Sequence, residues 1–74
     1  MARSKAHLRS RFGARIRQLR LERDMTQEEF ADHCGIARTY MSRVETGGAN
    51  PSLDAINTLA TGLRVKLEDL FQGL

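Results

Sequence analysis

The 74-residue chain has no tryptophan, one cysteine, one proline and two histidines. Its apolar runs are only a few residues long, whereas a membrane-spanning helix needs roughly 20. No apolar stretch follows the basic N-terminus, which argues against a secretory signal. Cys34 cannot form a disulfide within the chain, which fits a reducing compartment. We therefore expect a cytoplasmic protein that does not engage a membrane.

The residues of common catalytic sites are also scarce. With two histidines, no run of glycines to hold a phosphate and little chain to enclose a pocket, we expect neither an enzyme nor a cofactor. His33 and Cys34 are neighbours, but adjacent helical side chains diverge by about 100° and no further ligands cluster with them. We expect no metal site here, with Cys34 in the core and His33 on the surface.

Charge is present in quantity and is unevenly distributed. Residues 1–23 hold eight basic side chains and one acidic side chain, a balance of +7, within a chain whose net charge is +3. Residues 24–74 hold four basic and eight acidic side chains, a balance of −4. Such asymmetry alone indicates an anionic partner, with nucleic acid and a membrane surface as first candidates. The helix-turn-helix spacing described below favours nucleic acid, so we expect no membrane partner.

The spacing of apolar residues predicts an all-α fold of five short helices in one domain, residues 1–74, with residues 1–4 as a flexible basic arm. The first helix spans about 5–23, with one stripe made by Leu8, Phe12, Ile16 and Leu19. The fourth helix spans about 53–63, with a buried stripe made by Leu53, Ile56, Leu59, Ala60 and Leu63. The fifth helix covers 66–71, and its apolar residues are Leu67, Leu70 and Phe71.

Two further helices lie between these and are joined by a very short turn. Thr26 and Glu29 form the pattern of a capping box, and Gly35 suits a left-handed helix end. The next helix then covers about 37–46, although Ala37 offers no capping oxygen. Two helices so closely spaced must cross steeply, which is the helix-turn-helix geometry.

Two stretches of the chain resemble a known protein family: Met25-Thr26-Gln27-Glu28-Glu29-Phe30-Ala31 and the segment from Gly35 to Gly47. The chain resembles the lambda-repressor-like, Xre-type helix-turn-helix DNA-binding family over residues 8–72, and is similar within it to restriction-modification controller proteins. The resemblance implies a compact five-helix domain that binds double-stranded DNA. It also implies a structural ion pair between Arg20 and Glu45.

In a helix-turn-helix protein the second helix lies in the major groove. The face opposite Met41 and Val44 carries the expected base contacts, which are Arg38, Thr39, Ser42 and Arg43. The expected phosphate contacts are Gln27, Tyr40, Thr46 and Asn50, of which the last two are implied by the resemblance. Alternative roles without DNA contact stay open. Both arginines could be ordinary solvated surface residues, Tyr40 could cover the edge of the core, and Ser42 could be a neutral surface residue.

We expect a homodimer on a roughly palindromic operator, because one small domain offers few base contacts. The C-terminal helices carry more apolar residues than one small core needs, and the interface candidates are Leu63, Val65, Phe71 and Leu74. The alternative is that these residues belong to the protomer's own core. Binding would occlude or recruit RNA polymerase according to the position of the operator.

Two other functions fit parts of the pattern. One is an antitoxin-type or other protein-interaction module that binds DNA to regulate itself. The other is RNA binding through the basic arm, although the aromatic content of 5% offers little stacking surface. Arg3 and Lys5 are also candidates to follow a phosphate strand or a minor groove. The arginines along the first helix, Arg9, Arg11, Arg15 and Arg17, are either backbone contacts or an ordinary solvated face.

Overall fold

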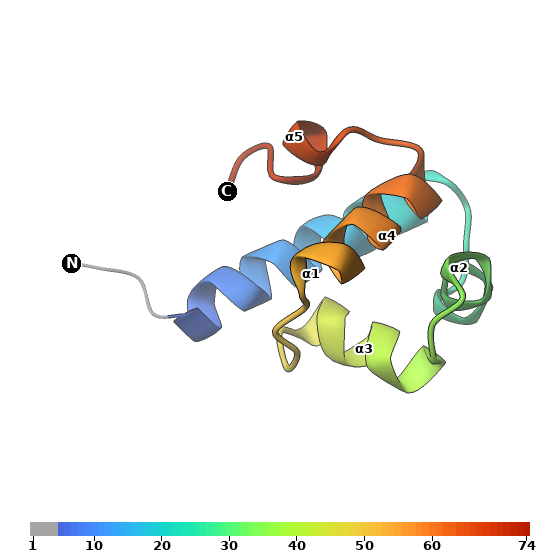
Figure 1. Ribbon diagram of the computed structural model, residues 1–74, viewed down its shortest axis with the longest axis horizontal. Helices are drawn as coiled ribbons and strands as arrows, with labels where there is room; N and C mark the ends of the chain where they lie inside the picture. Colours follow the sequence, from blue (N-terminus) through green and yellow to red (C-terminus); the bar gives the residue numbers. More distant parts are fainter. Residues whose placement is uncertain (1–4) are drawn as a thin grey trace.

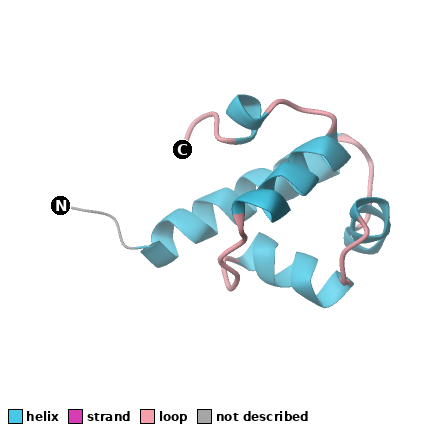
Figure 2. Cartoon of the chain, viewed as in Figure 1, coloured by secondary structure: helices cyan, strands magenta, loops and turns pink. Residues whose placement is uncertain are grey.

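The computed structural model describes residues 5–74, and within this range every regular element is a helix. The elements are α1 (Lys5–Glu22), α2 (Gln27–Cys34), α3 (Arg38–Thr46), α4 (Leu53–Leu63) and α5 (Leu67–Leu70). The pair α1 and α4, whose chains run in the same general direction in this view, forms the middle of the molecule, with α3 on one side and α5 on the other (Figures 1 and 2). The all-α fold is confirmed. The arm predicted at residues 1–4 lies outside the described residues.

Local chemistry sets the boundaries around α2. The Thr26 hydroxyl accepts a hydrogen bond from the Glu29 backbone N–H at 3.1 Å, and the Glu29 carboxylate accepts one from the Thr26 N–H at 2.8 Å. This reciprocal capping box satisfies two N–H groups that the helix itself leaves unpaired. Gly35 ends the helix in a left-handed conformation with φ 70°, which a side chain would disfavour. The predicted start and end of this helix are therefore confirmed.

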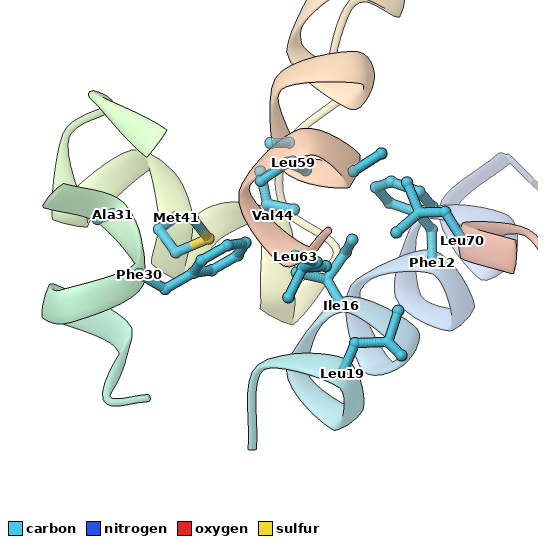
Figure 3. Close-up of a cluster of buried hydrophobic side chains, with 12 residues drawn as sticks. Phe12, Ile16, Leu19, Phe30, Ala31, Met41, Val44, Leu59, Leu63 and Leu70 are labelled. Carbon is cyan, nitrogen blue, oxygen red and sulfur yellow. The ribbon is translucent and has the colours of Figure 1, made fainter. Parts of the chain in front are cut away.

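The core lies where all five helices converge, and Figure 3 shows its side chains. The largest fully buried members are Phe30, Ile16, Met41, Leu59, Leu63, Leu70 and Val44. Burial of one such aliphatic or aromatic side chain stabilises the fold by about 1.5–3 kcal/mol. Because Met41 and Val44 are among them, this core holds one face of α3 and leaves the opposite face at the surface.

Two apolar residues lie nearer the surface than the sequence pattern placed them. Leu53 is 75% exposed and Leu8 is 51% exposed, so neither belongs to the buried stripe of its helix. Both are in the first turns of their helices, beyond the region where neighbouring helices cover the stripe. Leu63 is fully buried in the protomer, so it is unavailable to the dimer interface for which it was a candidate. Leu67 is 40% exposed, whereas Leu70 is fully buried.

Gly13 permits a close approach between α1 and α3 that the sequence pattern did not reveal. A Cβ atom at this position would meet the backbone oxygen of Val44 and lie 2.6 Å from that of Glu45. These two residues are near the C-terminal end of α3, so α1 supports the recognition helix from behind. The position of α3 therefore depends on the absence of a side chain at residue 13.

Candidate nucleic-acid interface

The outer face of α3 presents the residues predicted to read bases. Arg38, Thr39 and Arg43 are exposed and Ser42 is half-buried. The turn that leads into α3 is pinned by a hydrogen bond from the Ile36 N–H to the Ala31 carbonyl, 3.0 Å long. The structure thus brings the four candidates together on α3, on the side away from the buried Met41 and Val44. This helix diameter, with side chains, suits the major groove of B-DNA, which is about 12 Å wide.

A buried ion pair fixes α3 to α1. The Arg20 guanidinium donates from Nε to Glu45 Oε2 at 2.7 Å and from Nη2 to Glu45 Oε1 at 2.9 Å. Both residues are buried, and the hydrogen bonding to Glu45 raises the pKa of Arg20 above its ordinary value although burial opposes this. Arg20 also donates from Nη1 to the Met25 carbonyl at 2.8 Å. The pair that the family resemblance implied is present, and it joins α1, the α1–α2 turn and α3.

Gln27 is connected to the same carboxylate. Its Nε2 donates to Glu45 Oε1 at 3.2 Å, and the residue is half-buried at the start of α2. A phosphate oxygen can only accept hydrogen bonds, whereas a glutamine side chain has a donor end and an acceptor end. The carboxylate selects the orientation in which the Gln27 amide group turns its N–H₂ toward Glu45. The same N–H₂ group has a second N–H, which is a further hydrogen-bond donor.

Arg43 is held across the turn that follows α3. Its Nη2 donates to the Gly48 carbonyl at 2.9 Å, while its own carbonyl accepts from the Gly48 and Ala49 N–H groups at 2.8 and 3.1 Å. These three bonds close the chain reversal at residues 47–49. The guanidinium has further donors that remain available for a base edge.

The other predicted phosphate contacts differ in their exposure and in the contacts that they make within the protein. Thr46 is exposed, but its hydroxyl donates to the Ser42 carbonyl at 3.0 Å and must turn away from it to donate to a phosphate. Asn50 is exposed in the loop before α4. Tyr40 is half-buried and packs against the core, which agrees with the alternative that it covers the core edge.

Two of the arginines on α1 contact the C-terminal segment. Arg11 Nη2 donates to the Gly73 carbonyl at 3.0 Å, and Arg15 Nη2 donates to the Asp69 carbonyl at 2.7 Å. Figure 1 shows α5 and α3 on opposite sides of α1 and α4. Because both guanidinium groups donate to carbonyls of the C-terminal segment, they are turned away from the recognition helix. No pattern in the sequence marked this role, since the acceptors are backbone carbonyls distant in the chain.

The remaining candidates for a dimer interface are surface residues to different degrees. Phe71 is 42% exposed and stacks at a tilt on Phe12, with ring centroids 5.4 Å apart. Val65 and Leu74 are half-buried and pack against the core. Cys34 is likewise half-buried, and burial raises the pKa of its thiol, whereas His33 is exposed.

Two features of the described residues concern membranes and metal ions. No helix among them is long and apolar enough to cross a membrane. Within the same range, no three histidine, cysteine or acidic side chains lie close enough to bind a metal ion together.

The sequence of the whole helical unit also matches a family model. A model of the helix-turn-helix domain covers residues 11–71, from the first half of α1 to the end of α5. The chain belongs to the helix-turn-helix family. The resemblance that the motifs around Thr26–Ala31 and Gly35–Gly47 carried is thereby confirmed.

Individual members of this helix-turn-helix family are similar over most of the chain. The control protein C.BamHI of Bacillus amyloliquefaciens is 42% identical over 65 residues, which cover 86% of this chain and 80% of that protein. The restriction-modification controller protein C.AhdI from Aeromonas hydrophila has a crystal structure that matches with a TM-score of 0.81 and 40% identity, covering 84% and 94% of the two chains. Controller protein C.Esp1396I, solved as a tetramer with its natural 35 base-pair operator, matches with a TM-score of 0.81 and 32% identity, covering 88% and 86%.

Proposed function

We propose that this helix-turn-helix protein is a sequence-specific DNA-binding regulator of transcription that acts as a homodimer on a roughly palindromic operator. The observation that carries the proposal is the outer face of α3, where Arg38 and Arg43 are exposed on a helix fixed by a buried ion pair. A rigid helix that projects arginines can place them against guanine edges in the major groove. The operator complex of C.Esp1396I supports the choice of double-stranded DNA as the partner.

In this proposal the contacts divide into two kinds. Arg38, Thr39, Ser42 and Arg43 contact base edges from the first turns and outer face of α3. Gln27 donates to a phosphate from the start of α2, where the helix N-terminus also favours an anion. Thr46, Asn50 and Tyr40 contribute further phosphate contacts at the margins. Base contacts then determine the sequence, and phosphate contacts determine the docking position.

The homodimer follows from the size of the reading surface. One short recognition helix contacts only a few base pairs, whereas two copies on half-sites about 34 Å apart read twice as many. The tetramer of C.Esp1396I on its operator is an instance of association in a similar protein. We expect the dimer to act in the cytoplasm and to occlude or recruit RNA polymerase according to the position of the operator.

Selection of bound duplexes from random DNA tests the proposal directly. We expect a recovered consensus with two inverted half-sites, and recovery of no consensus would contradict sequence-specific binding. Two variants then test the division of contacts on the selected duplex and on versions with single base changes. Arg43→Ala should cost about 1–3 kcal/mol on the best sequence and relax the preference at one position, whereas Gln27→Ala should weaken all sequences alike.

Arg17→Ala is the matched control, because Arg17 is an exposed arginine on α1 outside the proposed interface. Its removal should leave the base preference unchanged. Equal losses on every duplex for the Arg43 and Gln27 variants would show that the two roles are wrongly assigned. Denaturant unfolding of each variant separates a loss of binding from a loss of fold.

A further inference from the structure

A basic hollow opens where the C-terminal ends of α1 and α4 meet α2. Its volume is about 240 Å³, and it is lined by Arg23, Met25, His33, Gly62 and Arg64. At about 30 Å³ for one water molecule in the liquid, this space is large enough for a phosphate group together with part of the molecule that carries it. The lining includes two arginines and a histidine but no acidic residue. The hollow therefore offers hydrogen-bond donors to an anion without a competing carboxylate.

The donors around the basic hollow come from three separate segments. Arg23 follows α1, His33 lies in the last turn of α2, and Arg64 is the C-cap residue of α4. Gly62 lets them converge, since a Cβ atom there would lie 2.5 Å from Cys34 Sγ and 3.7 Å from His33 Cδ2. The absence of that atom allows α4 to approach α2 closely enough for His33 and Arg64 to line the same hollow.

The two arginines keep donors that the fold does not use. Arg23 Nη1 donates to the Leu19 carbonyl at 3.2 Å, which holds the side chain at the end of α1. Because a guanidinium group has several N–H donors, this bond leaves others for a ligand. Among residues 5–74, neither Arg23 nor Arg64 forms an ion pair with a carboxylate. Their charges are therefore not compensated within the described part of the chain.

Arg64 also has a backbone conformation that favours glycine. Its φ of 57° and ψ of 41° are left-handed, and the matching C-cap positions of α2 and α3 are Gly35 and Gly47. An arginine is less stable than a glycine in this conformation. The helix is capped by the backbone N–H of Arg64, and its side chain has no hydrogen bond to any other of residues 5–74. The cap itself therefore does not explain the arginine.

We propose that the basic hollow binds the phosphate group of a small phosphorylated molecule. Guanidinium groups donate in pairs to phosphate oxygens, and the His33 imidazole adds an N–H donor even when it is neutral. Donors on three sides of a hollow suit the tetrahedral oxygens of a phosphate better than the two coplanar oxygens of a carboxylate. This inference goes beyond the proposed function and does not depend on it.

The location of the basic hollow separates its ligand from the operator. Figure 1 shows α2 between the beginning of α3 and the ends of α1 and α4. The proposed DNA contacts are on the outer face of α3 and at Gln27, which starts α2, whereas His33 is in the last turn of α2. A duplex on α3 and a phosphorylated molecule in the hollow can therefore be bound at the same time.

Titration of the isotope-labelled protein with inorganic phosphate, followed by NMR at constant ionic strength, tests the site. We expect backbone amide shifts that saturate with one dissociation constant and are largest around Met25, His33 and Gly62. Glycerol 3-phosphate should bind at least as tightly as the free ion, and acetate should bind more weakly than either. Shifts that do not saturate, or that are equal at every exposed arginine, would overturn the site. Tighter binding of acetate, or weaker binding of glycerol 3-phosphate than of the free ion, would contradict the proposed ligand.

Arg64→Gly separates ligand binding from folding. Glycine suits the left-handed conformation, so the unfolding temperature should equal or exceed that of the wild type. Loss of a charge-assisted hydrogen bond should nevertheless raise the phosphate dissociation constant about tenfold. Lys66→Gln is the matched control, because it removes an exposed positive charge two residues away that does not line the hollow. Equal losses of phosphate binding in the two variants would show that net charge, and not this site, attracts the anion.

Duplex binding by the same variant distinguishes a free ligand from a phosphate of the DNA. Arg64→Gly should bind a duplex selected from random DNA as the wild type does, with an unchanged slope of log K against log salt. Weaker duplex binding with a reduced slope would place a DNA phosphate in the basic hollow and overturn this inference. A wild type that binds phosphate in the hollow but selects no duplex would contradict the proposed function and support this site.

Discussion

Glu45 is the residue on which the recognition surface depends, although its charge opposes that of a phosphate backbone. Its carboxylate accepts two hydrogen bonds from Arg20 and one from Gln27, so its negative charge is compensated within the protein. Removal of one partner from such a buried pair typically costs 3–5 kcal/mol, because the other charge remains without compensation. The acidic residue in the recognition helix is therefore a support for the DNA-facing residues, and one carboxylate links the fold to the proposed phosphate contact.

Glu29 gives a prediction at the same scale. Hydrogen bonds from the Thr26 backbone N–H and hydroxyl hold the pKa of the Glu29 carboxyl below its ordinary value. The stabilisation is therefore present above the unfolded-state pKa of about 4.3 and is lost as the pH falls through the lower folded-state pKa. In urea unfolding, wild type should exceed Glu29→Gln in stability at pH 7, and the difference should shrink toward zero near pH 3.

Glu28→Gln serves as the control for this effect. Glu28 occupies the same first turn of α2 and feels the same helix dipole, but it lies outside the capping box. The difference in unfolding free energy between wild type and Glu28→Gln should therefore change less from pH 7 to pH 3 than the difference between wild type and Glu29→Gln. A difference between wild type and Glu29→Gln that stays constant from pH 7 to pH 3 would contradict the role of the ionised carboxylate.

Among the elements, the contact between α1 and α3 depends on Gly13. We expect Gly13→Ala to destabilise the protein, because the new methyl group would press against the Val44 and Glu45 carbonyls. Overpacking of this kind costs about 1–3 kcal/mol, which exceeds the gain of about 1 kcal/mol from alanine's better helix propensity. Thermal and urea unfolding measure the loss, and DNA binding should weaken as α3 is displaced.

Gly48→Ala is the matched substitution for this prediction. A Cβ atom at Gly48 would find its nearest neighbour, the Arg43 carbonyl oxygen, at 3.7 Å, which is an ordinary contact. This variant should therefore keep wild-type stability within about 1 kcal/mol. Equal stability of the two alanine variants would show that the close approach at Gly13 does not constrain the fold.

The features of these helices that could be predicted are those determined by residues close together in the sequence. The limits of α2 followed from Thr26, Glu29 and Gly35, since caps act within a few residues of one another. Periodicity located α4 but misplaced Leu53, because a stripe on a helix says nothing about which of its turns a neighbour covers. The role of Gly13 was not predicted, because a glycine inside a helix gives no periodic signal. The Val44 and Glu45 carbonyls that approach it are also distant in the chain.

For the candidate site the same distinction holds. Arg38, Thr39 and Arg43 lie on the surface as a helical wheel predicts, because the opposite face of α3 carries Met41 and Val44. The hydrogen bonds from Arg43 to Gly48 and from Gln27 to Glu45 were not predicted. Each needs the mutual placement of side chain and backbone after folding, which spacing along one helix does not contain.

At the scale of the whole molecule, the uneven charge has two different uses. Arg11, Arg15 and Arg20 come from the strongly basic first part of the chain, and each donates hydrogen bonds to other elements of the fold. Arg38 and Arg43 come from the net-acidic remainder, and both are exposed on the outer face of α3. The sign of the segment that contains an arginine therefore says little about whether that arginine faces an anionic partner.

This division predicts opposite outcomes for two arginine-to-glutamine changes. Arg15→Gln should lower the free energy of unfolding by about 1 kcal/mol through loss of the bond to the Asp69 carbonyl, and should leave the salt dependence of DNA binding unchanged. Arg38→Gln should leave stability unchanged, weaken binding to the selected duplex by about 1–3 kcal/mol and lower the slope of log K against log salt, because one cation fewer approaches the duplex and fewer counterions are released. Titration of a selected duplex at salt concentrations from 50 to 200 mM measures this slope. A reduced slope for Arg15→Gln would place the basic face of α1 on the DNA and make the charge of the first part of the chain a direct determinant of binding.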